Sequence, residues 1–170
     1  YYALWSYKVH HSPRFDLLGN CLAILAGLMP PQQANAMITW LEDTCADLRD
    51  QGALALDLPP CLIPTIQPGD ADWHHRYACF NRPGEYHNGG VWPFIAALYV
   101  AALVTAGRHT LAAHKLAALA ALVQVPRGGG LDYGFNEWFR APNGQPCGED
   151  WQTWSAALYL YAVDAVRQGE

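Results

Sequence analysis

The sequence contains few charged residues, and it lacks the features that would place it in several large classes of protein. Only 15% of its 170 residues are charged, and 15 acidic against 10 basic residues give a net charge of −5. Because no basic stripe is available to bind phosphates, we expect no nucleic-acid partner. No signal peptide is recognisable, and no uncharged apolar run is long enough to span a bilayer, so we predict a cytoplasmic protein with no membrane partner.

Signatures of metal, redox and serine-hydrolase sites are also missing. The five cysteines are widely spaced without a Cys-x-x-Cys pair, which favours free buried thiols in a reducing compartment. His74 and His75 are adjacent and therefore point differently, and neither a His-x-x-x-His pair nor a His-Glu-x-x-His motif occurs. No Gly-x-Ser-x-Gly elbow is present. We therefore predict no metal site and no cofactor.

The sequence is rich instead in apolar segments with helical character, since 52% of its residues are hydrophobic. They form five predicted helices, at about residues 14–28, 32–50, 91–106, 109–124 and 151–167. The first, third and fifth are apolar on nearly every face, which predicts helices buried all round. The second carries its apolar residues on one stripe, and the fourth has an alanine-rich composition that suits a more peripheral position.

The five helices alternate in character, from inner to outer and back to inner. Helical hairpins stacked in an inner and an outer layer form an α/α solenoid or a closed α/α toroid. A four-helix bundle fits less well, because the helices of a bundle are each amphipathic and its loops are short. We therefore predict an all-α fold of the toroid type, with residues 1–170 in a single domain.

Two long loops, at residues 51–90 and 126–150, lead into the third and fifth helices. Both precede inner helices, so we expect them at the same end of the fold, where a pocket would form. They are rich in Trp, Tyr, His, Asn and Glu, which suits a sugar site because aromatic rings stack on sugar C–H faces and polar groups bind hydroxyls. Any one of these aromatic residues could instead be a core or loop anchor, but their concentration favours a site.

Glu137 is the most interesting carboxylate in these loops. It lies between aromatic residues in FNEWF, after the flexible glycine run 128–130. Flanking apolar rings can hold a carboxylate against a substrate. From its position alone, however, a structural role as a helix cap or ion-pair partner is the simpler interpretation.

Three segments resemble neutral/alkaline invertases, and bacterial glycogen-debranching-type glucosidases are similar. RFDLLGNCLAILAGL (14–28) resembles a Phe-Asp-x-Leu-Gly-Asn helix, and YHNGGVWPF (86–94) resembles the segment that opens an inner helix. FNEWFRAPNGQPCGEDWQTWSAALYLYA (135–162) resembles a loop of Glu, two aromatic residues, a turn with Gly, and Gln-x-Trp-Ser or Gln-x-Trp-Thr. The three segments occur in family order and together span most of the chain.

The resemblance implies an (α/α)6 barrel that hydrolyses a glycosidic bond, with sucrose or a related small glucoside as substrate. It assigns Glu137 as the general base that activates water in an inverting mechanism. This chain has Trp138 and Phe139 where the plant-type enzymes have two tyrosines. The residues that we expect to contact substrate are Asp16, Tyr86, His87, Asn88, Trp92, Trp138, Gln152 and Trp154.

The resemblance covers only the C-terminal part of such a barrel, roughly five of twelve helices. The general acid of the family lies in the earlier half, so we expect it outside this chain, and we expect the isolated chain to hydrolyse little or no sucrose. The uncovered apolar surface predicts self-association or a missing N-terminal half of the barrel. Two alternatives stay open: a catalytically inactive helical module that binds carbohydrate or another partner, and a bare helical repeat scaffold that binds no sugar.

Overall fold

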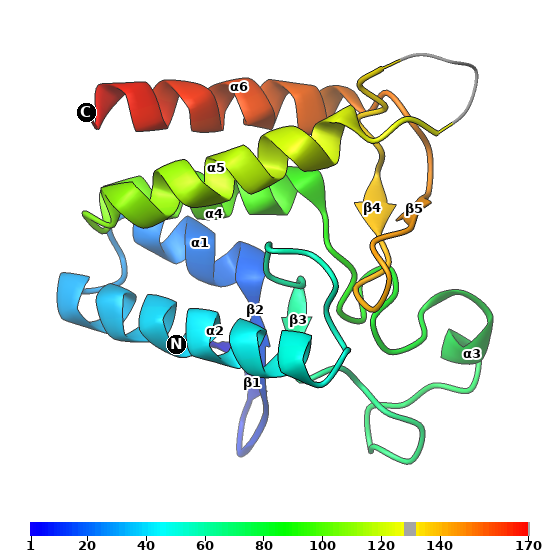
Figure 1. Ribbon diagram of the computed structural model, residues 1–170. Coiled ribbons are helices and arrows are strands. Elements are labelled where there is room, and N and C mark those ends of the chain that lie inside the picture. The colour runs from blue at the N-terminus through cyan, green and yellow to red at the C-terminus, as the bar shows by residue number, and fades with distance from the viewer. Residues whose placement is uncertain (128–131, 170) are drawn as a thin grey trace.

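The computed structural model describes residues 1–127 and 132–169 (Figure 1). Its helices are α1 (Leu17–Leu25), α2 (Pro31–Asp50), α3 (Tyr77–Phe80), α4 (Pro93–Thr105), α5 (His109–Gln124) and α6 (Thr153–Gln168). Its strands are β1 (Ala3–Tyr7), β2 (His10–Asp16), β3 (Leu62–Ile63), β4 (Trp138–Phe139) and β5 (Pro146–Cys147). The glycine run 128–130, which we predicted to be flexible, lies outside the described residues.

The five longer helices match the five predicted from the sequence to within a few residues. The start of the first helix differs, because α1 begins at Leu17 and the residues before it belong to β2. Asp16 has an extended backbone (φ −101°, ψ 116°), and its side chain accepts a hydrogen bond of 2.7 Å from the Gly19 N–H. Asp16 is therefore the N-cap residue that fixes where this helix starts.

The six helices confirm a mainly helical fold in the described chain, but two small sheets depart from the predicted all-α class. β2 pairs antiparallel with β1, with Tyr7 opposite His10, and with β3, with Phe15 opposite Ile63. β4 and β5 form the second antiparallel pair. Aromatic residues at the start of the chain favour strands, and the sheet buries Phe15 completely, 5.2 Å from the Trp40 ring of α2. Strands of two residues, such as β3 to β5, carry no period that a sequence pattern could reveal.

α4 is the centre of the helical core. Nine of its 13 residues are buried, and it contacts α1, α5 and α6. In Figure 1, α1, α4 and α6 begin on the side where β4, β5 and α3 lie, whereas α2 and α5 run in the opposite direction. The long loops therefore meet at one end of the helices, as the sequence predicts. This arrangement agrees with stacked helical hairpins, while closure into a toroid stays a prediction.

The three helices that we predicted to be buried all round differ in burial. α4 confirms the prediction, but α1 exposes Leu22, and α6 exposes 66% of Leu160 and 46% of Tyr161. For α1 and α6 the prediction was wrong within the described chain. α6 packs one side against α4 and α5, and Leu160 and Tyr161 remain exposed on the rest of the helix.

A buried lysine connects three helices and the loop after α2. Lys115 of α5 is 1% exposed, and its Nζ lies 2.8 Å from Glu42 Oε2 of α2 and 2.8 Å from Asp57 Oδ1. Tyr99 of α4 donates a hydrogen bond of 2.7 Å to Glu42 Oε1. Burial and the Glu42 charge raise the pKa of Tyr99, so the phenol remains a donor. Lys115, Glu42 and Tyr99 therefore all have partners, and an unpaired charge at this buried position would be costly.

Replacement of Lys115 by Ala should lower the free energy of unfolding by about 3–5 kcal/mol, because the Glu42 carboxylate loses its buried partner. His114→Ala is the matched control. His114 lies on the same helix and pairs with the same Asp57, but its side chain is 63% exposed, so its loss should cost at most about 1 kcal/mol. Urea denaturation of both variants measures the difference, and equal losses would contradict the central place of Lys115.

Stability should also depend on pH through Asp57. Burial alone would raise the pKa of this carboxyl, but hydrogen bonds from Lys115 and His114 and the charges of Lys115 and Arg49 outweigh it, and the pKa lies below its ordinary value of 3.8. A lowered pKa contributes stability that is present above the unfolded-state value and is lost as pH falls through the folded-state value. Asp57→Asn should therefore make Tm decline less steeply below about pH 4. A decline as steep as that of the unchanged chain would argue against this role.

Candidate functional site

The β4–β5 hairpin places Glu137 beside the start of α4. Val91 and Phe139 exchange two main-chain hydrogen bonds, of 2.9 Å from Val91 N to Phe139 O and 2.8 Å in the other direction. Glu137 immediately precedes β4, and Val91 immediately precedes Trp92, the N-cap residue of α4. The pairing therefore brings the carboxylate to the first turn of a helix that is distant in the sequence.

A second set of main-chain bonds connects α6 to the same loop. The Trp151 N–H donates to Gly134 O at 2.7 Å, and the Gln152 N–H donates to Phe135 O at 3.0 Å. Trp154 lies in the first turn of α6, which begins directly after Gln152. The first turn of α6 is thus held against the segment that leads to Glu137.

A pocket of about 230 Å³ opens where these segments meet. It is lined by Tyr86, His87, Trp92, Phe94, Glu137 and Trp154. The His87 ring lies nearly parallel to that of Trp92, with centroids 4.8 Å apart and an interplanar angle of 6°, and Phe94 lies 5.8 Å from Trp154. A carboxylate among aromatic rings, in a space of this size, can accommodate a small polar ligand with an apolar face, such as one sugar ring.

A larger cavity elsewhere offers less chemistry. It measures about 450 Å³ and lies between α2 and the loops around residues 60–67, 83–89 and 141–142. Its lining is mainly apolar, with four prolines and no charged side chain among the described residues. The smaller pocket at Glu137 is therefore the candidate site.

His87 and Glu137 are two of the polar residues that line the pocket. Burial of the His87 ring lowers its pKa below 6.5 and outweighs the charges of Glu137 and Asp16, which would raise it. His87 is therefore mostly neutral at about pH 7 and can donate and accept hydrogen bonds. Glu137 is half-buried, and its Oε2 accepts a hydrogen bond of 2.9 Å from the Glu149 N–H.

The loops around the pocket hold several bulky residues in the left-handed region of backbone space. Five described residues other than glycine have a positive φ, and four of them lie in these loops: Tyr86 (44°), Tyr133 (66°), Phe135 (40°) and Trp151 (52°). Each such conformation costs on the order of 1–3 kcal/mol and persists only where the surroundings enforce it, which occurs most often at functional sites. Their concentration here supports the assignment of the pocket as the site.

The structure brings five of the nine predicted site residues together in the pocket. They are Tyr86, His87, Trp92, Glu137 and Trp154. Phe94 also lines the pocket, and we did not predict it from the sequence. Its position at the end of YHNGGVWPF, two residues after Trp92, was the available signal.

The other four predicted residues lie outside the lining. Asp16 caps α1, although its charge still reaches His87. Trp138 is 9% exposed and packs on the ring of Tyr86 with centroids 5.9 Å apart. Gln152 is the N-cap residue of α6 and bonds through its main chain. Asn88 is fully buried, and its contact with substrate stays a prediction, as do the contacts of the other three.

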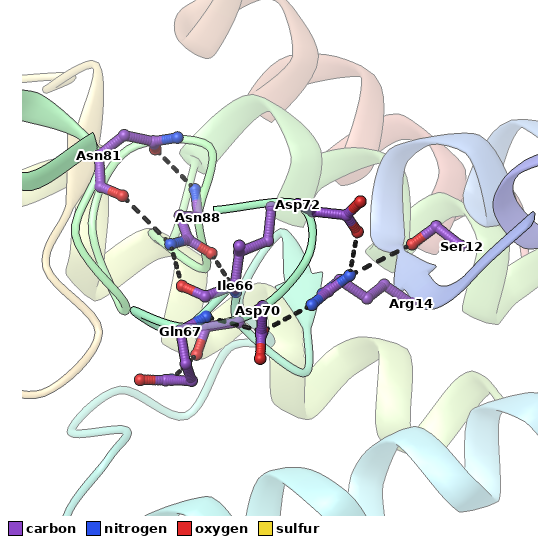
Figure 2. A network of polar contacts seen from close by, with 9 residues as sticks. Ser12, Arg14, Ile66, Gln67, Asp70, Asp72, Asn81 and Asn88 are labelled. Atoms are coloured by element: carbon purple, nitrogen blue, oxygen red, sulfur yellow. Dashed lines mark hydrogen bonds and ion pairs between the residues drawn. The ribbon is translucent and has the colours of Figure 1, made fainter. Parts of the chain in front are cut away.

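Asn88 uses its side chain to hold the neighbouring loop (Figure 2). Its Oδ1 accepts from Ile66 N at 2.6 Å, and its Nδ2 donates to Ile66 O at 2.8 Å and to Asn81 O at 3.1 Å. The same loop is held at Asp70, whose carboxylate accepts from Arg14 of β2 at 2.7 Å. Asn88 thus anchors the loop next to the pocket residues Tyr86 and His87.

Neither a cluster of metal ligands nor a membrane-spanning helix occurs among the described residues. Among residues 1–127 and 132–169, no group of three or more His, Cys, Asp and Glu side chains is arranged to hold a metal ion. No described helix combines the length and the apolar character needed to cross a membrane.

A family profile and individual proteins similar to this chain were both found, and their names agree. The sequence profile of a family described as alkaline and neutral invertase matches residues 8–168. The chain is 30% identical over 154 residues to probable alkaline/neutral invertase D of Arabidopsis thaliana, covering 88% of this chain and 26% of that protein. It is 29% identical over 154 residues to cytosolic invertase 1 of Oryza sativa subsp. japonica, covering 88% of this chain and 25% of that protein.

A third relative extends the match over more of the chain. Probable alkaline/neutral invertase A, chloroplastic, of Arabidopsis thaliana is 26% identical over 166 residues, which cover 95% of this chain and 24% of that protein. The chain therefore spans about a quarter of the length of the curated relatives that it matches.

Replacement of Asn88 by Asp should cost on the order of 3 kcal/mol in stability, because both Nδ2 donor bonds are lost and a buried carboxylate then faces two carbonyl oxygens. Asn143→Asp is the matched control, since Asn143 is exposed and its Oδ1 only accepts from Gln145 N, which Asp also permits. Chemical denaturation compares the two. A loss below about 1 kcal/mol for Asn88→Asp would show that the anchor is dispensable.

Proposed function

The chain belongs to the alkaline and neutral invertase family, and from this membership we propose that it supplies the catalytic base and part of the sugar site of an enzyme that hydrolyses sucrose or a related small glucoside. The observation that supports this most directly is the position of Glu137 in a pocket lined by aromatic rings. Because the chain spans about a quarter of its relatives, hydrolysis is proposed for the whole protein of which these helices form part.

Glu137 is the general base in this proposal. Its Oε2 is bound by the Glu149 N–H, and no described residue donates a hydrogen bond to its Oε1. We assign Oε1 to the attacking water, whose proton passes to Glu137 as the oxygen attacks the anomeric carbon. In an inverting reaction a general acid on the opposite side protonates the leaving oxygen, with the two carboxyl groups roughly 6.5–9.5 Å apart. We place that acid outside this chain.

The remaining lining residues would orient the sugar. Trp154 is 49% exposed at the pocket, so one side of its indole can stack on the C–H face of a sugar ring. His87, being mostly neutral, can bond a hydroxyl as either donor or acceptor. Trp92 is only 3% exposed and gives its Nε1–H to Tyr86 O at 2.9 Å, so it serves mainly as the surface on which His87 rests.

Trp138 and Phe139 stand where the plant-type enzymes have two tyrosines, and the structure shows what these two side chains do in this chain. Phe139 is fully buried and Trp138 is 9% exposed, so both side chains belong to the core of the hairpin. At these positions the chain contributes packing, and we propose that hydroxyl recognition falls to His87 and to the main chain nearby.

Two further expectations remain part of the proposal. The exposed side of α6 carries Leu160 and Tyr161 and is suited to packing against further helices, either of another copy or of the missing half of the barrel. For the compartment, we propose the cytoplasm. One of the relatives is named a cytosolic invertase, although another is named chloroplastic.

The alternative function is a helical module that binds carbohydrate or another partner without hydrolysing it. The same pocket could hold a sugar ring if Glu137 only bonded a hydroxyl. Family membership favours hydrolysis, because the relatives are named invertases.

The test compares Glu137→Gln with Glu149→Gln in a protein that contains this chain together with the remaining helices of the barrel. Glu137→Gln should reduce kcat for sucrose by about 10²–10⁴-fold, the usual contribution of a general base, with little change in KM. Glu149 contacts Glu137 through its main-chain N–H and carbonyl oxygen, both of which the substitution keeps, so Glu149→Gln should leave kcat nearly unchanged. Equal rates for Glu137→Gln and the unchanged enzyme, with sugar still bound, would favour the alternative. Rapid sucrose hydrolysis by the isolated chain, lost on Glu137→Gln, would instead show that the acid lies within it.

A further inference from the structure

A break in the register of the β4–β5 hairpin lies opposite Glu137. Trp138 pairs with Cys147, and Phe139 pairs with Pro146, so continuation of the ladder would place Gly148 opposite Glu137. The Glu137 N–H donates instead to Glu149 O at 2.8 Å. Gly148 and Glu149 together therefore oppose one residue, which is the pattern of a β-bulge whose first residue is a left-handed glycine (φ 74°).

The bulge frees a main-chain donor for the Glu137 side chain. In a regular antiparallel ladder the Glu149 N–H would donate to a main-chain carbonyl of the partner strand. Here the Glu149 N–H donates to Glu137 Oε2 at 2.9 Å. The hydrogen bonds at Glu137 N and Oε2 both end on Glu149, so one residue fixes both the backbone and the carboxylate of Glu137.

Gly148 leaves no room for a side chain in this arrangement. A Cβ atom at position 148 would come within 2.7 Å of Glu137 Cβ and 2.9 Å of Glu137 Cδ, and it would lie closer still to Oε2. Real Cβ atoms essentially never approach other atoms so closely, so the Glu137 side chain would have to rotate away. The carboxylate lies in the space that the missing Cβ leaves empty.

We propose that Gly148 is a positioning residue for Glu137. The bulge at Gly148 aims the Glu149 N–H at Oε2 and leaves the adjoining space to the carboxylate, so that Oε1 remains for water. The catalytic meaning of this device rests on the proposed function, whereas its geometry does not. β-Bulges beside active sites commonly re-aim a side chain in this way.

A matched control separates this role from the ordinary need for glycine at a positive φ. Gly52 has nearly the same φ as Gly148 (71°), but a Cβ atom there would meet no atom within 4 Å. Alanine at either position suffers similar backbone strain. Only Gly148→Ala also displaces the Glu137 carboxylate.

The decisive experiment follows the amide of residue 149 by NMR in the isolated chain. Glu149→Gln serves as the background, so that this residue has no carboxyl of its own. Its amide proton should lie downfield at a fixed neutral pH, because it donates a charge-assisted hydrogen bond to the Glu137 carboxylate. Addition of Glu137→Gln or Gly148→Ala should move this resonance upfield, and addition of Gly52→Ala should leave it in place. Both Ala variants should lower Tm.

Two outcomes would overturn the positioning role. One is an amide resonance of residue 149 that Gly148→Ala leaves in place, and the other is a resonance that is not downfield in the Glu149→Gln background. Kinetics distinguish a failure of the proposed function. If the amide behaves as expected but Glu137→Gln does not slow sucrose hydrolysis in the larger protein, the bulge holds the carboxylate and Glu137 is not the base. If the amide behaves as expected and Glu137→Gln slows hydrolysis, Gly148→Ala should lower kcat and change KM little. Gly52→Ala should change neither kcat nor KM.

Discussion

The two hydrogen bonds between Val91 and Phe139 are the contact on which the candidate site depends. They join the segment that opens α4 to the hairpin that carries Glu137, and neither segment alone forms a pocket. Their neighbours in sequence then meet: Trp92 follows Val91, and Glu137 lies two residues before Phe139. Because both main-chain groups of each residue are bonded, the separation of the two segments is fixed by backbone geometry, and side chains only fill the space that results.

Much of the helical part of the fold could be predicted, because helices repeat a pattern over many residues. The buried positions of α2 recur at the spacing of a helical stripe, as the sequence indicates: Ala34, Met37, Ile38, Leu41 and Cys45. The strands β3 to β5 could not be predicted, since two residues define no period. The sequence did not predict the exposed residues of α6. The apolar composition of a helix shows which residues it can bury, whereas the neighbouring elements decide which residues it does bury.

The site shows a similar division between motif and geometry. The segment YHNGGVWPF contributes four residues to the pocket lining, but its sequence could not separate residues that face the pocket from those that build it. Tyr86 and His87 line the pocket, whereas the next residue, Asn88, turns into the interior and bonds Ile66. Such a change of direction between adjacent residues depends on backbone angles, here a left-handed Tyr86, which the amino-acid types alone do not determine.

The bonds from Trp151 and Gln152 to the loop before β4 also bear on the order in which the molecule assembles. Chains are synthesised from the N-terminus, and α4 and α5 can begin to pack before α6 has emerged from the ribosome. The pocket needs the first turn of α6 for Trp154, so it cannot exist at that stage, however complete the rest of the core is. A nascent chain of this protein therefore cannot form the complete pocket until α6 has docked.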